Sequence, residues 1–95
     1  MNLTYSQALD HLKNNVKMQR SGWNGKGMYL IYFSPVANGQ EQLNIEGDQK
    51  LPLLPFIVMK TADNMFVPWL ASQTDILADD WQTYQSLDNH FQSVV

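Results

Sequence analysis

The chain has 95 residues, of which 44% are hydrophobic, a formal net charge of -3 and no cysteine. This length supports one modest hydrophobic core, so we expect a single domain over residues 1–95. The absence of cysteine excludes disulfides, a thiol nucleophile and a thiolate zinc site, and two separated histidines make a poor metal cluster. We therefore predict no metal and no other cofactor. Six Lys and Arg residues are too few for a nucleic-acid polymer as partner.

The sequence also favours a soluble location. No apolar run reaches the length that spans a membrane. A secretory signal would have a basic start and a hydrophobic centre, whereas the segment from Asn2 to Gln7 is largely polar. We expect a cytosolic protein without a membrane partner.

The N-terminal segment predicts a helix. Thr4 followed three residues later by Gln7 has the form of a capping box, in which each side chain accepts from a backbone N–H group at the helix start. Apolar residues then recur at helical spacing, at Ala8, Leu9, Leu12 and Val16. Beyond them "VKMQR" alternates apolar and polar residues, which predicts a short strand.

The next stretch, "RSGWNGKGMYL" from Arg20 to Leu30, joins a glycine-rich turn to an apolar run. As a plain turn, its glycines supply the backbone geometry and Trp23 folds back onto the sheet. As a binding surface, its backbone N–H groups with Arg20 or Lys26 hold a phosphate while Trp23 stacks on a base. The glycine spacing matches neither common nucleotide-binding motif, so the residue types leave both interpretations open.

The middle of the chain gives weaker signals. "MYLIYF", residues 28–33, predicts a strand buried on both faces. Residues 34–55 allow an excursion in which Asn38 and Gly39 close a hairpin and "QLNIE" returns as its second strand. The two prolines of "LPLLP" should prevent regular pairing, and we expect this segment to cross the edge of the sheet.

A second hairpin is clearer. "FIVMKT" and "MFVPW" flank "ADN", whose Asp63 and Asn64 tolerate the positive backbone angles of a tight turn. Pro68 cannot donate to a neighbouring strand, so it should end the pairing of the second strand. After a short helix, "DDWQTY" predicts an edge strand, and residues 85–95 form a tail or a contact between subunits.

The stretch "VPWLASQTDILADDW" carries both a structural and a binding interpretation. Ser72 and Asp75 form a second capping box, and the structural interpretation places the large apolar residues in the core: Trp69, Leu70, Ile76, Leu77 and Trp81. In the binding interpretation Trp69 stacks on a base beside the helix start, where anions are favoured. Ser72, Gln73 and Thr74 then offer polar groups to the ribose or base, and Asp75 accepts from a ribose hydroxyl.

These elements predict an α+β fold. We expect a small antiparallel sheet of about four or five strands, with the N-terminal helix across one face and a short second helix after Trp69. The second face should be covered by another copy of the chain, because 12% aromatic content is high for so small a core and the edge strands would otherwise be exposed.

No catalytic constellation is visible. Asp79 and Asp80 are adjacent, so they do not form a facing carboxylate pair by spacing alone, and no Ser-His-Asp arrangement stands out. We predict that the protein is not an enzyme. Two alternatives to a nucleotide-binding protein stay open. One is a module that inhibits a host protein through exposed aromatic residues, and the other, with less support, is an enzyme that degrades nucleotides.

Two long stretches resemble a known family. "RSGWNGKGMYL" and "PFIVMKTADNMFVPWLASQTDILADDW" closely resemble the paired signatures of the second family of Thoeris anti-defence (Tad) proteins. With "TYSQALDHLKNNVK", the resemblance covers most of the chain up to Tyr84, apart from the middle excursion. It implies a phage sponge protein that sequesters, without cleaving them, the cyclic ADP-ribose signals made by TIR-domain enzymes.

The resemblance also implies partners and site residues. Its members are homotetramers built from dimers with ligand pockets between protomers, and the implied ligands are cyclic ADP-ribose isomers and, in some members, cyclic oligonucleotides. The matching positions of this sequence are Trp23, Asn24, Gly25, Lys26, Trp69, Ser72, Thr74 and Asp75. With Arg20, which the residue types place beside a phosphate, they are the predicted ligand-binding residues.

Overall fold

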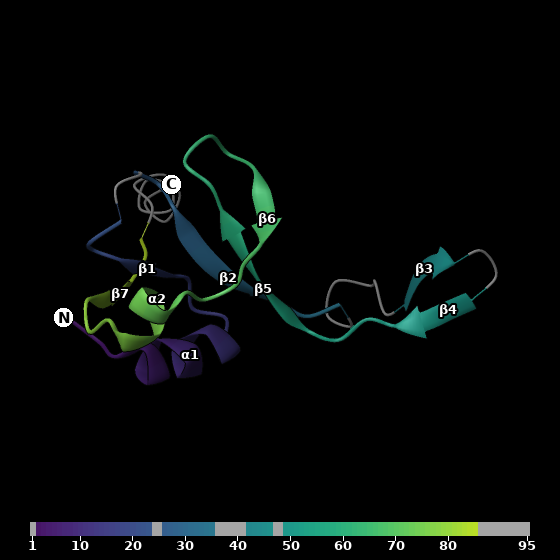
Figure 1. Ribbon diagram of the computed structural model, residues 1–95, viewed down its shortest axis with the longest axis horizontal. Helices are drawn as coiled ribbons and strands as arrows, with labels where there is room; N and C mark the ends of the chain where they lie inside the picture. The colour runs from purple at the N-terminus through teal and green to yellow at the C-terminus, as the bar shows by residue number, and fades with distance from the viewer. Residues whose placement is uncertain (1, 24–25, 36–41, 47–48, 86–95) are drawn as a thin grey trace, which may run out of the picture.

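A computed structural model describes residues 2–23, 26–35, 42–46 and 49–85 of the chain. Its elements in chain order are α1 (Tyr5–Lys13), β1 (Met18–Arg20), β2 (Tyr29–Phe33), β3 (Gln42–Glu46), β4 (Gln49–Pro52), β5 (Phe56–Lys60), β6 (Phe66–Pro68), α2 (Gln73–Leu77) and β7 (Trp81–Thr83) (Figure 1). This arrangement confirms the α+β class, with an N-terminal helix and a short second helix after Trp69. No helix in the described ranges is long and apolar enough to cross a membrane.

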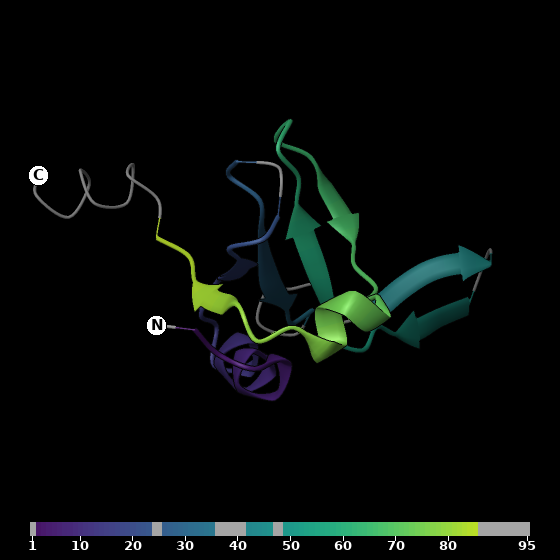
Figure 2. The same cartoon turned by 60° about the vertical axis from the view of Figure 1, so that its left-hand side comes forward.

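Five strands form one antiparallel sheet in the order β6-β5-β2-β1-β7, and β3 pairs with β4 in a separate two-stranded sheet. Figures 1 and 2 show α1 and α2 side by side, while the β3–β4 pair projects away from the main sheet. The N-terminal segment joins the far edge, because Leu3 and Trp81 exchange backbone hydrogen bonds of 2.7 and 3.0 Å. This edge carries β7, as predicted for "DDWQTY".

The predicted capping box starts α1. The Thr4 side chain accepts from the Gln7 backbone N–H at 3.2 Å, and the Gln7 side chain accepts from the Thr4 N–H at 2.9 Å. The helix places its apolar stripe against one face of the sheet, where the fully buried core consists of Ala8, Leu12, Met18, Leu30 and Trp81. The short strand predicted within "VKMQR" is β1.

The strand predicted over "MYLIYF" forms as β2, but the expectation that it is buried on both faces is wrong. Leu30 is fully buried under α1, whereas Tyr29 and Ile31 on the opposite face are only partly buried. Successive strand residues point to opposite faces, and α1 covers one of them. Within the described residues, the second face of β2 therefore has no helix packed on it.

The middle segment differs from its predicted pairing. "QLNIE" forms β3, yet it pairs with β4 and not with β2, whose neighbours are β1 and β5. Asn38 and Gly39 lie outside the described residues. The prediction that "LPLLP" cannot pair is wrong for its first half, because Pro52 lies opposite Gln42 at the end of β4. A proline is tolerated there because it stands at the end of a strand that is paired on one side only.

The second predicted hairpin is confirmed. β5 and β6 pair antiparallel with Lys60 opposite Phe66 and Val58 opposite Pro68, the last residue of β6. Asn64 has φ 66°, the left-handed conformation expected for this turn. The Thr61 hydroxyl accepts from the Met65 N–H at 3.0 Å and thereby closes the turn.

The capping box predicted for α2 also forms, but the core prediction after it is only partly right. Trp81 is fully buried, whereas Leu70, Ile76 and Leu77 are 91%, 47% and 79% exposed. Asp75 is the residue of α2 that points toward the rest of the protein, where it accepts hydrogen bonds from Arg20 and Trp81. Because each helical residue turns the next by about 100°, fixing Asp75 inward directs Ile76 and Leu77 outward.

Candidate functional site

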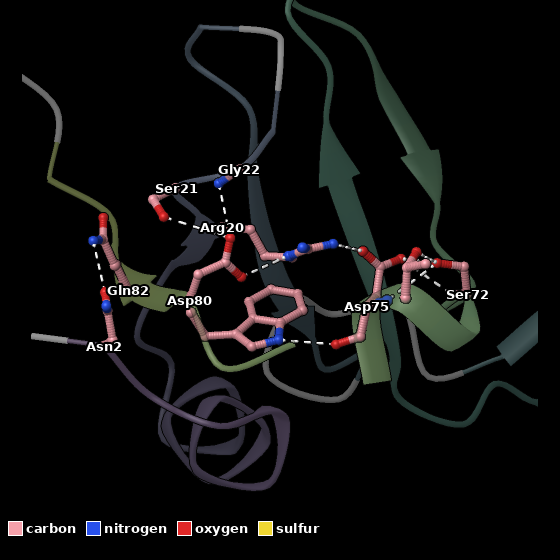
Figure 3. Close-up of polar contacts among 10 residues, drawn as sticks. Asn2, Arg20, Ser21, Gly22, Ser72, Asp75, Asp80 and Gln82 are labelled. Atoms are coloured by element: carbon pink, nitrogen blue, oxygen red, sulfur yellow. Dashed lines mark hydrogen bonds and ion pairs between the residues drawn. The ribbon is translucent and has the colours of Figure 1, made fainter. Parts of the chain in front are cut away.

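Arg20 joins the two stretches that the sequence singled out. It is the last residue of β1, and its Nε donates to Asp80 Oδ1 while its Nη1 donates to Asp75 Oδ1, both at 2.8 Å (Figure 3). The three side chains are 18%, 24% and 13% exposed, in the order Arg20, Asp80, Asp75. One guanidinium therefore ties the glycine-rich turn to the segment around α2, using charge-assisted bonds that little water can replace.

Asp80 also fixes the start of the glycine-rich turn. Its Oδ2 accepts from the Gly22 N–H at 2.9 Å and from the Ser21 hydroxyl at 3.4 Å (Figure 3). A Cβ atom at Gly22 would lie 2.8 Å from that oxygen, so this position requires glycine for close approach. In the sequence, Asp80 stands out only as the neighbour of Asp79 in a possible carboxylate pair, and this role was not predicted.

Asp75 serves α2 and Arg20 together. Its Oδ2 accepts from the Ser72 N–H at 3.0 Å and from the Ser72 hydroxyl at 2.8 Å, and its Oδ1 accepts from Arg20. The Ser72 and Thr74 hydroxyl oxygens are 2.8 Å apart. Both carboxylate oxygens of Asp75 are thus occupied within the chain, whereas Ser72 and Thr74 remain exposed at the helix start. We call this set the Arg20 network: Arg20, Ser21, Gly22, Ser72, Thr74, Asp75 and Asp80.

The network keeps both carboxylates ionised at neutral pH. The hydrogen bond from Arg20 lowers the pKa of Asp80 below its ordinary 3.8, with a further contribution from the Gly22 N–H. Burial by itself would raise the pKa of Asp75, but hydrogen bonds from Ser72, Arg20 and the Trp23 side chain outweigh burial and lower it. An ionised carboxylate held by several donors is a poor general acid or base.

Aromatic rings pack directly beside the network. The buried Trp81 ring contacts Trp23 edge to face at 5.5 Å between centroids, and Trp69 in the same manner at 6.1 Å. Tyr5 lies 5.7 Å from Trp81 and 6.5 Å from Trp69. The Trp81 indole Nε1 donates to the Asp75 carbonyl at 3.0 Å. We call these four rings the Trp81 cluster; Trp81 is its centre, and Trp23 and Trp69 stay partly exposed.

The structure brings together most of the predicted ligand-binding residues. The Arg20 network and the Trp81 cluster form one candidate site, which contains Arg20, Trp23, Trp69, Ser72, Thr74 and Asp75. Lys26 is exposed, and its neighbour Gly27 accepts from Lys60 Nζ at 2.9 Å. Asn24 and Gly25 lie outside the described residues. Sequence reasoning missed Tyr5, Asp80 and Trp81 as site residues; the Trp-to-Trp spacing in "VPWLASQTDILADDW" was the available signal for Trp81.

The arrangement is suited to holding a planar, polar ligand more than to breaking a bond in it. Partly exposed indoles offer stacking surfaces, and the Ser72 and Thr74 hydroxyls offer hydrogen bonds. Arg20 is committed to two carboxylates, which makes it a support for the site in this chain. Among the described residues, no three His, Asp or Glu side chains gather in a way that could hold a metal ion.

Comparison with known proteins matches this same region. A family model described as Thoeris anti-defense 2-like domain matches residues 3–84. A relative described as Thoeris anti-defense 2, from Bacillus phage SP01, is 40% identical over 81 residues, which cover 83% of this chain and 91% of the relative. The matched residues include both stretches that form the candidate site and stop at the start of the C-terminal tail.

Proposed function

The chain belongs to the Thoeris anti-defense 2-like family, and on that basis we propose that it is a phage anti-defence sponge. It binds cyclic ADP-ribose-type signals made by TIR-domain proteins in the host cytoplasm and withholds them from the effector that they would activate. The signal is released unchanged. A sponge of this kind needs tight binding and no chemistry.

One observation carries the proposal: the bond between Arg20 and Asp75 joins the two stretches, so that Trp23 and Trp69 flank Trp81 beside exposed hydroxyls. The indoles can stack on the base, which every nucleotide signal carries. Ser72 and Thr74 can bond to ribose hydroxyls or phosphate oxygens. Lys26, on the same glycine-rich turn as Trp23, supplies a cation for a phosphate, and Asn24 and Gly25 of that turn complete the proposed contacts.

The electrostatics of the candidate site support binding without cleavage. Asp75 and Asp80 are the carboxylates of the site, and both are ionised and held by Arg20. Hydrolysis of a nucleotide bond would use an activated nucleophile or a proton donor with a pKa near neutrality. The donors around these carboxylates shift their pKa values the opposite way, which favours a role in holding the loop and α2.

Exposed apolar side chains support an assembly of several copies. They occur on the β5–β6 turn, β6, the segment after it and α2: Met65, Phe66, Val67, Leu70, Ile76 and Leu77. We call them the β6–α2 surface. Large exposed apolar residues in a soluble protein often mark an interface, and among the described strands β6 lies at an edge of the five-stranded sheet, where another copy can pair. We propose a homo-oligomer, a tetramer, with the ligand bound near the contact between protomers.

The decisive experiment measures the fate of the signal. The protein is incubated with an excess of a TIR-derived cyclic ADP-ribose isomer and then denatured, and the released small molecules are quantified by mass spectrometry and by effector activation. We expect full recovery of the input and inhibition that saturates at a fixed ratio of signal to protein. A product that grows with time and protein concentration would overturn the sponge in favour of an enzyme.

A control separates nucleotide binding from binding to a host protein. Wild-type protein and a Trp23→Ala, Trp69→Ala double variant are titrated with the same signal by calorimetry. We expect saturable binding by the wild type and a large loss in the variant. If neither protein binds the signal, and the wild type forms a stable complex with a host protein, the inhibitory module becomes the better interpretation.

A further inference from the structure

Two lysines flank one tyrosine outside the candidate site. Lys17 Nζ lies 4.7 Å from the centroid of the Tyr29 ring, and Lys60 Nζ lies 5.8 Å from the same centroid. The Tyr84 ring packs on Tyr29 at 4.6 Å between centroids. All four side chains are partly exposed. We call this group the Tyr29 site: Lys17, Tyr29, Lys60 and Tyr84.

The Tyr29 site lies on the face of the sheet opposite α1. Leu30 is buried under α1, and the neighbouring residue Tyr29 therefore points to the other face. Lys60 is directly opposite Tyr29 in the β2–β5 pair, so it shares that face. The Lys17 carbonyl accepts from the Tyr84 N–H at 2.8 Å. This backbone bond holds Lys17 and Tyr84 next to each other. Backbone pairing thus places the whole group.

The positive charge of this group is not balanced within the described chain. Ion pairs among the described residues involve Arg20 alone, so neither lysine is paired with a described carboxylate. Ring faces attract ammonium groups but carry no net charge to neutralise them. This accumulation stands out because the chain as a whole has a net charge of -3 and only six Lys and Arg residues. Two like charges held near one ring attract an anion.

We propose that the Tyr29 site is a second ligand site, which binds the diphosphate group of a small molecule. A diphosphate carries more negative charge than a single phosphate, so two ammonium groups near one ring favour it. Lys60 is already oriented, because its Nζ donates to the Gly27 carbonyl at 2.9 Å. The partly exposed Tyr84 ring, which packs beside Tyr29, can contact whatever group the diphosphate carries. This site goes beyond the proposed function and does not depend on it.

Calorimetric titration with inorganic pyrophosphate, at fixed ionic strength and without divalent metal, tests the proposal. We expect saturable binding by the wild type, with weaker binding of orthophosphate. Lys17→Met and Lys60→Gln should each weaken pyrophosphate binding by about tenfold, as for the loss of one charge-assisted contact. The glutamine keeps a donor for the Gly27 carbonyl. Lys13→Met is the matched control, since Lys13 is exposed on α1 and its loss changes the net charge equally.

The outcomes separate a built site from general charge. A tenfold loss in the Lys17 and Lys60 variants, with Lys13→Met close to wild type, supports the site. Equal losses in all three variants, or no saturable binding by the wild type, would overturn it. Circular dichroism checks that each variant is folded. The cyclic ADP-ribose isomer is titrated in parallel: unchanged affinity in Lys17→Met supports a separate site, whereas parallel loss of both ligands would overturn the claim that it is a second one.

Discussion

At the scale of single residues, Arg20 makes contacts that its residue type did not predict. Residue types alone suggested a cation for a ligand phosphate, but its guanidinium is bonded to Asp75 and Asp80. The three side chains are largely buried, so a lost partner leaves a charge that water cannot fully solvate. Arg20 therefore contributes to the candidate site by holding the glycine-rich turn against α2.

Replacing Arg20 with methionine should destabilise the protein. The variant roughly keeps the length of the side chain but removes the one donor that both carboxylates share, and we expect a loss of about 1 to 3 kcal/mol in the free energy of unfolding. Urea unfolding at pH 7 measures it, with Lys13→Met as the control for a lost surface charge. A loss in Arg20→Met no larger than in the control would contradict the role assigned to the network.

The same network predicts how stability depends on pH. The pKa values of Asp75 and Asp80 are lower in the folded protein than the ordinary 3.8, so the folded state binds these protons less readily than the unfolded state. Their contribution to stability is complete above the unfolded pKa and is lost as the pH falls through the folded values. The free energy of unfolding should thus fall at pH below about 4. Asp80→Asn, measured by urea unfolding at several pH values, should show a smaller fall; an identical profile would contradict the prediction.

Trp23 and Trp69 should contribute directly to ligand affinity. Each change to alanine should cost about 1 to 3 kcal/mol of binding free energy, the range for a base stacked on an aromatic side chain. Both rings also pack on Trp81, so thermal unfolding must show how much stability each variant loses. Phenylalanine at the same positions is the control that keeps an aromatic face. Unchanged affinity in both folded alanine variants would assign the two rings to packing alone.

At the scale of elements, α2 is short and depends on its cap. It has five residues and no buried side chain, so little packing supports it. Ser72 holds its first turn through reciprocal bonds with Asp75, and Asp75 in turn is bonded to Arg20. A helix of this kind is a peripheral element that polar contacts hold in place.

Ser72→Ala should therefore loosen α2 and lower stability by about 1 kcal/mol, the usual cost of losing an N-cap side chain. Gln73→Ala is the control, because Gln73 is exposed and lies one position further along the helix. Backbone amide exchange of Asp75 and Ile76 should accelerate in the Ser72 variant only. Equal exchange rates in both variants would show that the cap does not hold this helix.

At the scale of the whole molecule, the β6–α2 surface is the feature that a lone copy leaves unexplained. Six large apolar side chains near one another in sequence are exposed there, including Leu70 at 91% and Leu77 at 79%. The open face of the main sheet adds the partly exposed rings of Phe33 and Phe56. Both features agree with the proposed homo-oligomer.

The assembly should dissociate when charge is placed on that surface. Light scattering after size exclusion should give a tetramer for the wild type at low micromolar concentration and smaller species for Phe66→Asp and Leu77→Asp. Asp10→Lys, at an exposed position of α1, is a control for altered charge outside the surface. A monomeric wild type would contradict the oligomer and the shared ligand site. A tetramer that survives both aspartates would place the contact elsewhere.

The sequence by itself determined the features that depend on neighbouring residues. Both capping boxes, the turn at Asn64 and the end of β6 at Pro68 follow from local hydrogen bonding and allowed backbone angles, which a few adjacent residues specify. The family resemblance is confirmed, and it could be recognised from the sequence because its signatures are continuous stretches of residues.

Only the tertiary structure decided which residues meet and which face is covered. The exposure of Ile76 and Leu77 and the two ion pairs of Arg20 with Asp75 and Asp80 both depend on contacts between residues far apart in the chain. Local preferences do not encode such contacts, because the balance of burial and charge pairing is settled by packing of the whole chain. Arg20 shows the difference: its type predicts a cation that binds an anion, and only the fold reveals that Asp75 and Asp80 are anions bonded to it.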